Sequence, residues 1–272
     1  MRVGPGAASL DPPLLTSNEI ACVRRHGKLP RDDCRFGGCG SQFGEDWALL
    51  PTLLQATQGR ARRARFVEIG AYRGASLSNT LMYERCFNWT GVLIEASPPN
   101  FQALRASGRK ARLVHSAVCN GDGKTNATVP IAVEGYAVSG QLELMSPSFI
   151  RTHRKEGPGL LRNSNISHVP CRSLQSILRL PPPLPSTRPS FDLLSLDVEG
   201  AEERVISTVD PAAFAVIVVE ADGTDRAKEQ RVEKIILEAG LRRQARGGGI
   251  GHIRLSRVYL RPEVAELPPW RP

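Results

Sequence analysis

Residues 66 to 74 read Phe66-Val-Glu-Ile-Gly-Ala-Tyr-Arg-Gly74, a short apolar strand that runs into a glycine turn. A helix is expected directly after the turn, and a second apolar strand, Gly91-Val-Leu-Ile94, ends on Glu95. Strand, glycine turn, helix, strand and terminal acid make up half of a nucleotide-binding βαβ unit. Gly70 and Gly74 let the backbone approach a ligand where a Cβ would clash, and Glu95 can accept hydrogen bonds from both hydroxyls of a ribose. The stretch therefore predicts a pocket for a nucleoside-containing cofactor.

The glycine spacing indicates which cofactor is expected. A dinucleotide site needs three glycines as G-x-G-x-x-G so that a pyrophosphate can lie on the helix. Here the pattern is Gly70-x-x-x-Gly74, with Tyr72 where the middle glycine would be. That spacing favours a ligand without a diphosphate, and S-adenosylmethionine is the commonest of that kind. The alternative is a plain strand-to-helix turn, in which a glycine only supplies a positive φ angle.

The rest of the chain alternates strands with helices, which predicts a mainly parallel sheet with right-handed crossovers. Residues 1–40 are expected to be an irregular N-terminal extension, 41–261 the domain and 262–272 a C-terminal tail, with a proline-rich connector at 181–189. Strands are expected at 65–69, 91–95, 111–117, 129–133, 141–145, 169–171, 191–197, 214–220 and within 250–261, and helices at 47–56, 75–86, 101–106, 173–180, 202–209 and 229–239.

Composition excludes few classes of protein. With 272 residues, 41% hydrophobic and 23% charged, the chain is long enough for a substantial core, and no apolar run is long enough to cross a bilayer. The net charge of +9 invites a nucleic-acid partner, but aromatic residues are only 6% and none is interleaved with the basic runs as base stacking would need. We therefore expect no specific nucleic-acid partner and interpret these runs as solvated flanks: 60–65, 109–112, 151–155 and 242–246.

The cysteines and the glycosylation sequons indicate the cellular compartment in which the protein is expected. The six cysteines contain no C-x-x-C pair, which argues against a zinc site. Cys86 and Cys119 are expected at opposite edges of the sheet, whereas a Cys119–Cys171 bond is geometrically possible. The first residues do not have the pattern of a secretory leader. Three Asn-x-Ser/Thr sequons and an even number of cysteines nevertheless hint at a secretory lumen. We therefore expect a soluble protein of either the cytoplasm or that lumen. The sequons begin at Asn88, Asn126 and Asn165.

Four blocks of the chain, in this order, resemble the FkbM family of S-adenosylmethionine-dependent methyltransferases, over about residues 41–261. The resemblance implies a Rossmann-like methyltransferase fold: a seven-stranded, mainly parallel sheet with an antiparallel C-terminal pair and helices on both faces. It also implies O-methylation of a hydroxyl. The blocks are Ser41-Gln-Phe-Gly-Glu-Asp46, Phe66-Val-Glu-Ile-Gly-Ala-Tyr-Arg-Gly74 with Ser78-Asn-Thr80, Trp89-Thr-Gly-Val-Leu-Ile-Glu95 and Leu196-Asp-Val-Glu-Gly-Ala-Glu202.

The resemblance also implies which residues hold the cofactor. The glycine loop would wrap the methionine part and the ribose, Glu95 would bind the ribose hydroxyls, and the end of the third strand would border the adenine. The chain departs from the family pattern in two places. Tyr72 and Arg73 replace small or polar residues, which affects the space around the methionine carboxylate. No acid follows the third strand to bind the adenine amino group, which affects adenine recognition. The implied cofactor-binding residues are Glu68, Gly70, Ala71, Gly74, Glu95, Ser116 and Ala117.

Asp197 and Glu199 are the candidate catalytic residues. Transfer of a methyl group to an alcohol requires a carboxylate or imidazole that removes the hydroxyl proton. Both residues leave the apolar fourth strand at its carboxyl end, beside the crevice where such sheets bind ligands. A capping or turn role, or Mg²⁺ binding by the Asp-x-Glu pair, is the alternative, although no metal site is expected.

Other residues are second candidates. Glu220 ends the fifth strand at the same edge and is a further candidate base. His115 lies inside the third strand and is interpreted as a core histidine, while His153 and His168 fall in a variable loop that is expected to cover the site. The segment 42–46 either begins a helix or, in the family interpretation, lies over the cofactor through Gln42, Glu45 and Asp46.

The sequence therefore predicts an S-adenosylmethionine-dependent O-methyltransferase whose acceptor is a sugar or another small polyhydroxyl molecule. The first alternative is a catalytically silent Rossmann-like domain that binds a nucleoside or a glycan. The second is an RNA methyltransferase, which only the positive charge suggests. The acceptor and the oligomeric state cannot be derived from the sequence.

Overall fold

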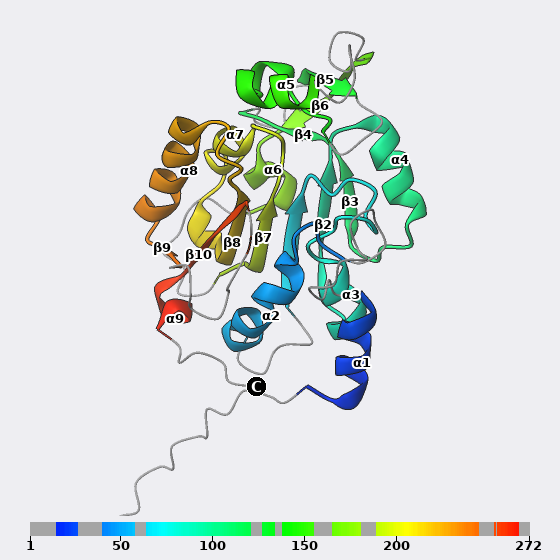
Figure 1. Ribbon diagram of the computed structural model, residues 1–272, viewed down its shortest axis with the longest axis vertical. Coiled ribbons are helices and arrows are strands. Elements are labelled where there is room, and N and C mark those ends of the chain that lie inside the picture. The colour runs from blue at the N-terminus through cyan, green and yellow to red at the C-terminus, as the bar shows by residue number, and fades with distance from the viewer. Residues whose placement is uncertain are drawn as a thin grey trace, which may run out of the picture.

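The structure is a computed structural model of the chain (Figure 1), and strands and helices alternate along it. Among the residues that it describes, no helix combines the length and the apolar composition needed to cross a bilayer. The described residues are 15–26, 40–57, 64–120, 127–133, 138–154, 165–180, 189–244, 253 and 255–266.

A seven-stranded sheet forms the centre of the molecule. Its first five strands are parallel, and β10 runs antiparallel to both of its neighbours. This is the Rossmann-like α/β sheet that the sequence predicts, antiparallel C-terminal strand included. In spatial order the strands are β3 (Arg112–His115), β2 (Thr90–Glu95), β1 (Arg65–Ile69), β7 (Phe191–Leu196), β8 (Phe214–Glu220), β10 (Ser256–Leu260) and β9 (Arg242–Arg243).

Helices cover both faces of this sheet, and its central strands are buried along almost their whole length. All six residues of β7 are buried, as expected for a parallel strand packed on two sides. One face packs against α1 (Ser17–His26), α2 (Glu45–Ala56), α3 (Leu81–Phe87), α4 (Pro98–Ala106) and α9 (Pro262–Ala265). The other face packs against α6 (Leu174–Leu178), α7 (Glu202–Ile206) and α8 (Arg226–Glu238).

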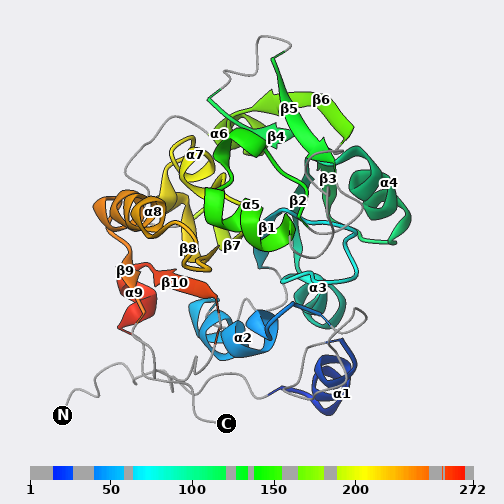
Figure 2. The same ribbon diagram turned by 45° about the horizontal axis from the view of Figure 1, so that its top comes forward.

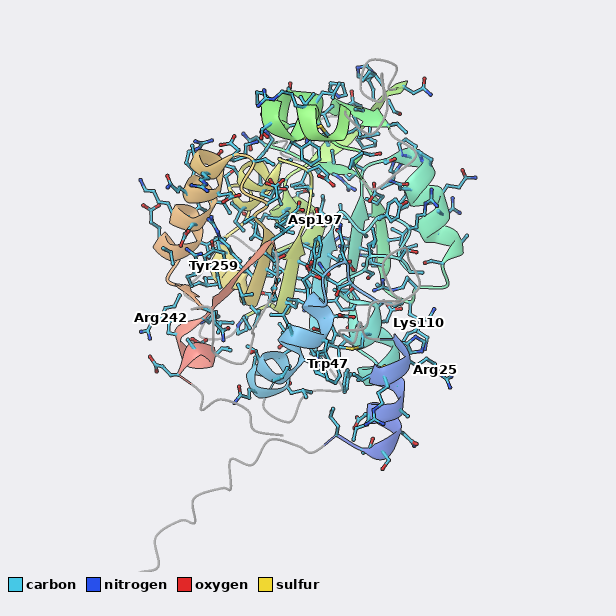
Figure 3. All side chains as sticks on the ribbon, viewed as in Figure 1. Arg25, Trp47, Lys110, Asp197, Arg242 and Tyr259 are labelled. Atoms are coloured by element: carbon cyan, nitrogen blue, oxygen red, sulfur yellow. A yellow bond between two sulfur atoms is a disulfide. The ribbon has the colours of Figure 1, made fainter. Side chains whose placement is uncertain are left out.

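A small second sheet lies beyond the carboxyl ends of the parallel strands (Figures 1 and 2). It has the order β4 (Ala117–Val118), β6 (Asn165–Arg172) and β5 (Thr128–Val133). Helix α5 (Pro147–Arg154) lies beside it in both views. Together they roof the edge of the large sheet at which Asp197 lies in Figure 3. The remaining elements are the 3-10 helices η3 (Leu142–Leu144) and η4 (Pro211–Ala213).

Three expected elements differ in the structure. The helix expected at 75–86 begins only at Leu81, because the preceding residues bind Glu68 instead of continuing a helix. The strand expected at 141–145 is the 3-10 helix η3, closed by the N–H of Leu144 on the carbonyl of Gln141 at 2.9 Å. The expected third strand divides after His115, and its last residues pair with β6 in the small sheet.

The N-terminal extension also contains a helix where irregular structure was expected. Helix α1 starts with a capping box in which the N–H of Thr16 donates to Glu19 at 2.7 Å and the N–H of Glu19 donates to the Thr16 hydroxyl at 3.2 Å. Val23 is buried in the core, so this helix is part of the folded unit. Several expectations lie outside the described residues: most of the connector at 181–189, the basic residues 60–63 and 246, Cys34, Cys39 and Asn126.

Candidate functional site

The glycine turn after β1 brings the site residues together. Gly70 has φ 82°, and its N–H and that of Ala71 both donate to the carbonyl of Ile94, each at 3.1 Å. A Cβ on Gly70 would overlap the backbone carbonyl oxygen of Asp197. The turn thus packs directly on the residue that follows β7, because this position has no side chain.

Glu68 holds the loop that follows the turn. Its carboxylate accepts hydrogen bonds from the Ser78 hydroxyl and the Asn79 N–H, each at 2.9 Å, and from the Thr80 hydroxyl. The fully buried guanidinium of Arg109 donates to Ser78 at 2.9 Å and to the carbonyl of Gly74 at 2.7 Å. The structure therefore places Glu68, Ala71 and Gly74 in the support of the loop, outside the lining of the pocket described next.

Arg109 was interpreted from the sequence as part of a solvated basic run, and this is wrong. Its side chain has no exposed surface, and its Nε lies 3.2 Å from the carboxylate of Glu84 and its Nη1 4.0 Å from that of Glu68. These two carboxylates offset the cost of burying the positive charge of the guanidinium. The sequence carries no signal for this contact, because nothing in the run 109–112 distinguishes its first residue from exposed neighbours.

One pocket at the carboxyl edge of the sheet gathers most of the predicted site residues. Its volume is about 810 Å³, including space open to solvent. Gln42, Leu77, Asn100 and Gln141 reach it from four different loops and helices. The predicted residues that line it are Gly70, Glu95, Ser116, Ala117, Asp197 and Glu199, and Tyr72 lines it as well.

Glu95 is oriented in this pocket by two backbone donors. The N–H of Tyr72 donates to one carboxylate oxygen at 2.7 Å and the N–H of Ser97 to the other at 2.8 Å. Each oxygen keeps a further lone pair, so the carboxylate can still accept hydrogen bonds from a ligand. Burial raises the pKa of Glu95 to about 7, and these backbone hydrogen bonds oppose the increase.

Gln141 is a pocket residue that the sequence analysis did not single out. Its side chain is 4% exposed, and its Oε1 has no hydrogen-bond partner. A buried acceptor without a partner is costly, so its presence in the lining of a pocket favours a ligand with a hydrogen-bond donor. This position could not be predicted because Gln141 lies in a polar stretch of the sequence without periodicity.

Asp197 and Glu220 form a carboxyl pair at the ends of β7 and β8. Their side chains are hydrogen-bonded to each other. Burial raises the pKa of Asp197 to about 6 even though the hydrogen bond from Glu220 lowers it. Burial and then the charge of Asp197 raise the pKa of Glu220 much further. At neutral pH the proton therefore stays on Glu220, and Asp197 carries the charge.

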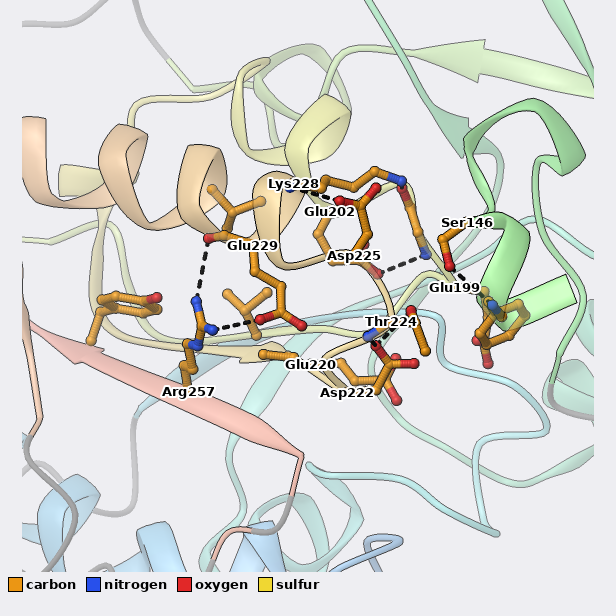
Figure 4. Close-up of a pocket in the computed structure, with 16 residues that line it drawn as sticks. Ser146, Glu199, Glu202, Glu220, Asp222, Thr224, Asp225, Lys228, Glu229 and Arg257 are labelled. Atoms are coloured by element: carbon orange, nitrogen blue, oxygen red, sulfur yellow. Dashed lines mark hydrogen bonds and ion pairs between the residues drawn. The ribbon is translucent and has the colours of Figure 1, made fainter. Parts of the chain in front are cut away.

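Glu199 stands between two pockets. It lines the pocket just described and a second one of about 540 Å³, open space included, which is drawn in Figure 4. Its φ of 55° is left-handed, a conformation that non-glycine residues rarely adopt and that occurs at functional sites. Burial raises the pKa of Glu199, and the charge of Asp197 raises it further.

The second pocket is lined by carboxylates and hydroxyls together with apolar side chains such as Phe149 and Val232 (Figure 4). Its two cationic side chains already have partners. Lys228 donates to the carbonyl of Gly200 at 2.8 Å and to that of Leu144, and Arg257 donates to Glu229 at 2.5 Å. Because the cations are occupied, the polar groups that face an incoming molecule are chiefly hydrogen-bonding oxygens, beside an apolar part of the wall.

The remaining candidates lie around these pockets. Gln42 lines the first pocket, whereas Glu45 and Asp46 hold their own turn, through the Phe43 N–H at 2.9 Å and the Ser41 hydroxyl at 2.7 Å. His115 bonds the carbonyl of Ala96 at 3.1 Å, in keeping with a core role. His168 is exposed, the side chain of His153 lies outside the described part of the chain, and the exposed Arg73 stacks on Tyr72. Within the described ranges, no three acidic, cysteine or histidine side chains are placed to hold a metal ion.

Comparison with known proteins gives one family. The family model of the methyltransferase FkbM domain matches residues 68–254. No curated protein sequence matches the chain.

Several solved structures resemble the chain. Precorrin-6y C5,15-methyltransferase from Geobacter metallireducens GS-15 is 12% identical over 67% of this chain, with a TM-score of 0.34, and the chain covers 65% of its length. Methyltransferase FkbM from Methylobacillus flagellatus KT is 12% identical over 89% of this chain and 58% of its own, with a TM-score of 0.39. The SAH-bound methyltransferase PaMTH1 from Podospora anserina is 14% identical over 91% of this chain and 97% of its own, with a TM-score of 0.36.

Proposed function

The chain belongs to the FkbM family of S-adenosylmethionine-dependent methyltransferases, and from this premise we propose that it methylates a hydroxyl group of a sugar or of another small polyhydroxyl acceptor. The observation that carries the proposal is the buried carboxylate of Glu95 at the end of β2, which two backbone N–H groups orient in the pocket. A nucleoside ligand needs such an acceptor for its ribose hydroxyls.

The residues of the pocket fit S-adenosylmethionine. Glu95 would bind the ribose, and the unpartnered Oε1 of Gln141 offers an acceptor for a donor such as the adenine amino group. Gln141 would thus provide the hydrogen-bond acceptor for the adenine amino group that, in many methyltransferases, an acid after the third strand provides. Ser116 and Ala117 would border the adenine, Gly70 would allow close approach of the methionine part, and Glu68, Ala71 and Gly74 would shape the loop around it.

Asp197 is the proposed general base. When bound, S-adenosylmethionine supplies an electrophilic methyl carbon on a positively charged sulfur, which is a good leaving group. The acceptor hydroxyl gives its proton to the carboxylate of Asp197, which remains charged at neutral pH because Glu220 holds the shared proton. Glu199, whose raised pKa favours its protonated form, would donate a hydrogen bond that orients the acceptor.

The pocket of Figure 4 is the proposed acceptor site. It adjoins the cofactor pocket through Glu199, so an acceptor bound there lies beside the proposed base. Hydroxyls and carboxylates such as Ser146, Asp222 and Thr224 line it, which suits a molecule with several hydroxyl groups.

Two experiments test the proposal together. Calorimetry with S-adenosylmethionine and S-adenosylhomocysteine measures cofactor binding, and a tritiated-methyl transfer screen over sugars, glycans and lipids measures turnover. Asp197→Asn is expected to abolish transfer while cofactor affinity changes little, because the proposed role of Asp197 is to take the acceptor's proton.

The same measurements identify the alternatives. Tight cofactor binding without transfer to any acceptor would favour the silent binding domain. RNA affinity that falls steeply with salt would favour the RNA methyltransferase. Absence of cofactor binding would contradict the proposed function as a whole.

A further inference from the structure

The Asn88-Trp-Thr90 sequon lies on an exposed turn between α3 and β2. Asn88 ends α3 in a left-handed conformation, with φ 55°. Its side chain is exposed and makes no hydrogen bond with the described residues, while Trp89 is buried beneath it and stacks on Tyr83 at 4.8 Å. The hydroxyl residue Thr90 is also exposed. The turn thus holds an asparagine amide in solvent at a fixed position.

The Asn165-Ile-Ser167 sequon lies at the first residues of β6. Asn165 and Ile166 are both exposed, and Ile166 is 48% exposed although it is a large apolar residue. Asn165 pairs with Val133 at the end of β5, and no hydrogen bond from its side chain occupies it within the described structure. Asn165 thus presents its side-chain amide to solvent, as N-glycosylation requires.

Four cysteines of the described chain are paired as two disulfides. Cys22–Cys86 joins α1 to α3 with 5.5 Å between the Cα atoms, and Cys119–Cys171 joins β4 to β6 with 5.8 Å. Each bond closes a long stretch of chain, of 64 and 52 residues. Disulfides between structural elements persist in oxidising compartments and are rare where thiols are kept reduced.

We propose that this protein matures in the oxidising lumen of the secretory pathway and carries N-linked glycans on Asn88 and Asn165. The two observations are independent, since sequon exposure does not depend on cysteine pairing. Exposed sequons alone have no consequence in the cytoplasm, and only the lumen accounts for both features.

The chemistry needs a donor and an oxidant that this compartment supplies. The side-chain amide nitrogen of each asparagine forms a bond to the anomeric carbon of an oligosaccharide attached to a polyprenyl diphosphate. The bond from that carbon to the diphosphate oxygen breaks, the polyprenyl diphosphate leaves with the electron pair, and the amide proton passes to a base. Each disulfide forms by exchange with the disulfide of an oxidoreductase, which becomes a dithiol.

Neither glycan obstructs the proposed site. Asn88 precedes the first residue of β2, whereas Glu95 is its last, so the two lie at opposite edges of the sheet. Asn165 is exposed at the first residue of β6 and pairs with Val133, whereas the residues of β6 that pair with the pocket-lining Ile131 and Ala117 are Ser167 and Cys171. Modification is therefore compatible with cofactor binding.

The test uses the protein captured from cells that make it. Treatment with peptide-N-glycosidase is expected to increase its mobility in a gel, and mass spectrometry is expected to find Asn88 and Asn165 converted to aspartate. Alkylation under denaturing, non-reducing conditions is expected to leave Cys22, Cys86, Cys119 and Cys171 unlabelled.

Variants of the full gene assign each glycan. A Thr128→Ala background removes the third sequon, whose asparagine lies outside the described residues. In that background Asn88→Gln and Asn165→Gln are each expected to remove one glycan. Thr90→Ala is expected to match Asn88→Gln, whereas Thr90→Ser, which keeps the sequon, is expected to match the parent. Native protein with unmodified Asn88 and Asn165, or with the four cysteines alkylated, overturns the proposal even if methyl transfer is found.

Discussion

Glu95 combines a buried carboxylate, two fixed backbone donors and a pKa of about 7. We predict that Glu95→Ala weakens S-adenosylhomocysteine binding by about 1.5–3 kcal/mol, the scale of hydrogen bonds to a charged group. Because the charged form is the better acceptor, wild-type affinity is expected to rise roughly tenfold between about pH 6 and about pH 8. Calorimetry at several pH values measures both effects.

The matched control for this titration is Glu95→Gln, which cannot ionise. Its affinity is expected to be low and nearly independent of pH over the same range. A wild-type affinity that does not change with pH, or an unchanged dissociation constant in Glu95→Ala, would remove Glu95 from the proposed ribose site.

Gln141 allows a test in which two measurements change in opposite directions. Gln141→Met keeps the size of the side chain and removes the unpartnered buried oxygen. We predict that the free protein is as stable as wild type or more stable, while S-adenosylhomocysteine binds about 0.5–1.5 kcal/mol more weakly. Urea denaturation and calorimetry provide the two values. If stability falls and affinity is unchanged, Gln141 has only a structural role.

Gly70 and Gly223 form a matched pair, with φ 82° and 81°. A Cβ on Gly223 would meet nothing within 4 Å, whereas one on Gly70 would overlap Asp197. Gly223→Ala is therefore expected to cost only the conformational penalty, roughly 1–2 kcal/mol, and Gly70→Ala a further ~1–3 kcal/mol from overpacking. Denaturant unfolding measures both. Equal losses would show that the approach of the turn to Asp197 is not tight.

At the scale of elements, helix α1 is attached to the core by Val23 and by one disulfide to α3. We predict that the paired replacement of Cys22 and Cys86 by alanine lowers stability by up to about 4 kcal/mol, the loop-entropy value for a stretch of this length. Hydrogen exchange is expected to find α1 unprotected and the seven-stranded sheet intact. The control is the same replacement of Cys119 and Cys171, which should leave α1 protected. Protected α1 in the first variant would contradict the prediction.

The strands were predictable because their signal is local. A continuous apolar run as short as Phe214 to Val219, bounded by turns, favours a buried strand over a helix, and β8 occupies it. The loop at 75–80 was not predictable, because its shape depends on Arg109, some thirty residues later in the chain. No helix forms there, because these residues make hydrogen bonds with Glu68 and Arg109 instead, and no local sequence pattern predicts those bonds.

The residues of the candidate site also fall into two groups, those that a local sequence signal predicts and those that only tertiary contacts bring into place. Glu95 and Asp197 could be predicted because each ends an apolar strand, and parallel strands end at one edge of the sheet. The pairing of Asp197 with Glu220 follows from the adjacency of β7 and β8, which the sequence does not specify. Gln141 reaches the pocket from a loop whose path is set by tertiary contacts alone.

For the molecule as a whole, buried acids should make stability depend on pH. Folding raises the pKa of Glu95 to about 7 and that of Asp197 to about 6, and it also raises the pKa of Glu199. A folded state that binds more protons than the unfolded state loses stability as pH rises. We therefore predict that the free energy of unfolding falls between about pH 5 and about pH 7, although the lowered pKa of His26 opposes this.

Urea denaturation across this range checks the prediction. Glu95→Gln and Glu220→Gln are each expected to reduce the slope, because the folded protein keeps a proton on these acids over a pH range in which the unfolded chain releases it. Stability that increases steadily up to about pH 8 would contradict the assignment of these acids as buried and protonated.

The clamp that Arg109 makes with Glu68 and Glu84 has a consequence for repeated turnover. Because this buried ionic lock fixes the loop at 75–80 through groups of the chain itself, we expect the loop to keep its shape through repeated rounds of ligand binding and release. A binding surface built in this way needs no ordering step before each round.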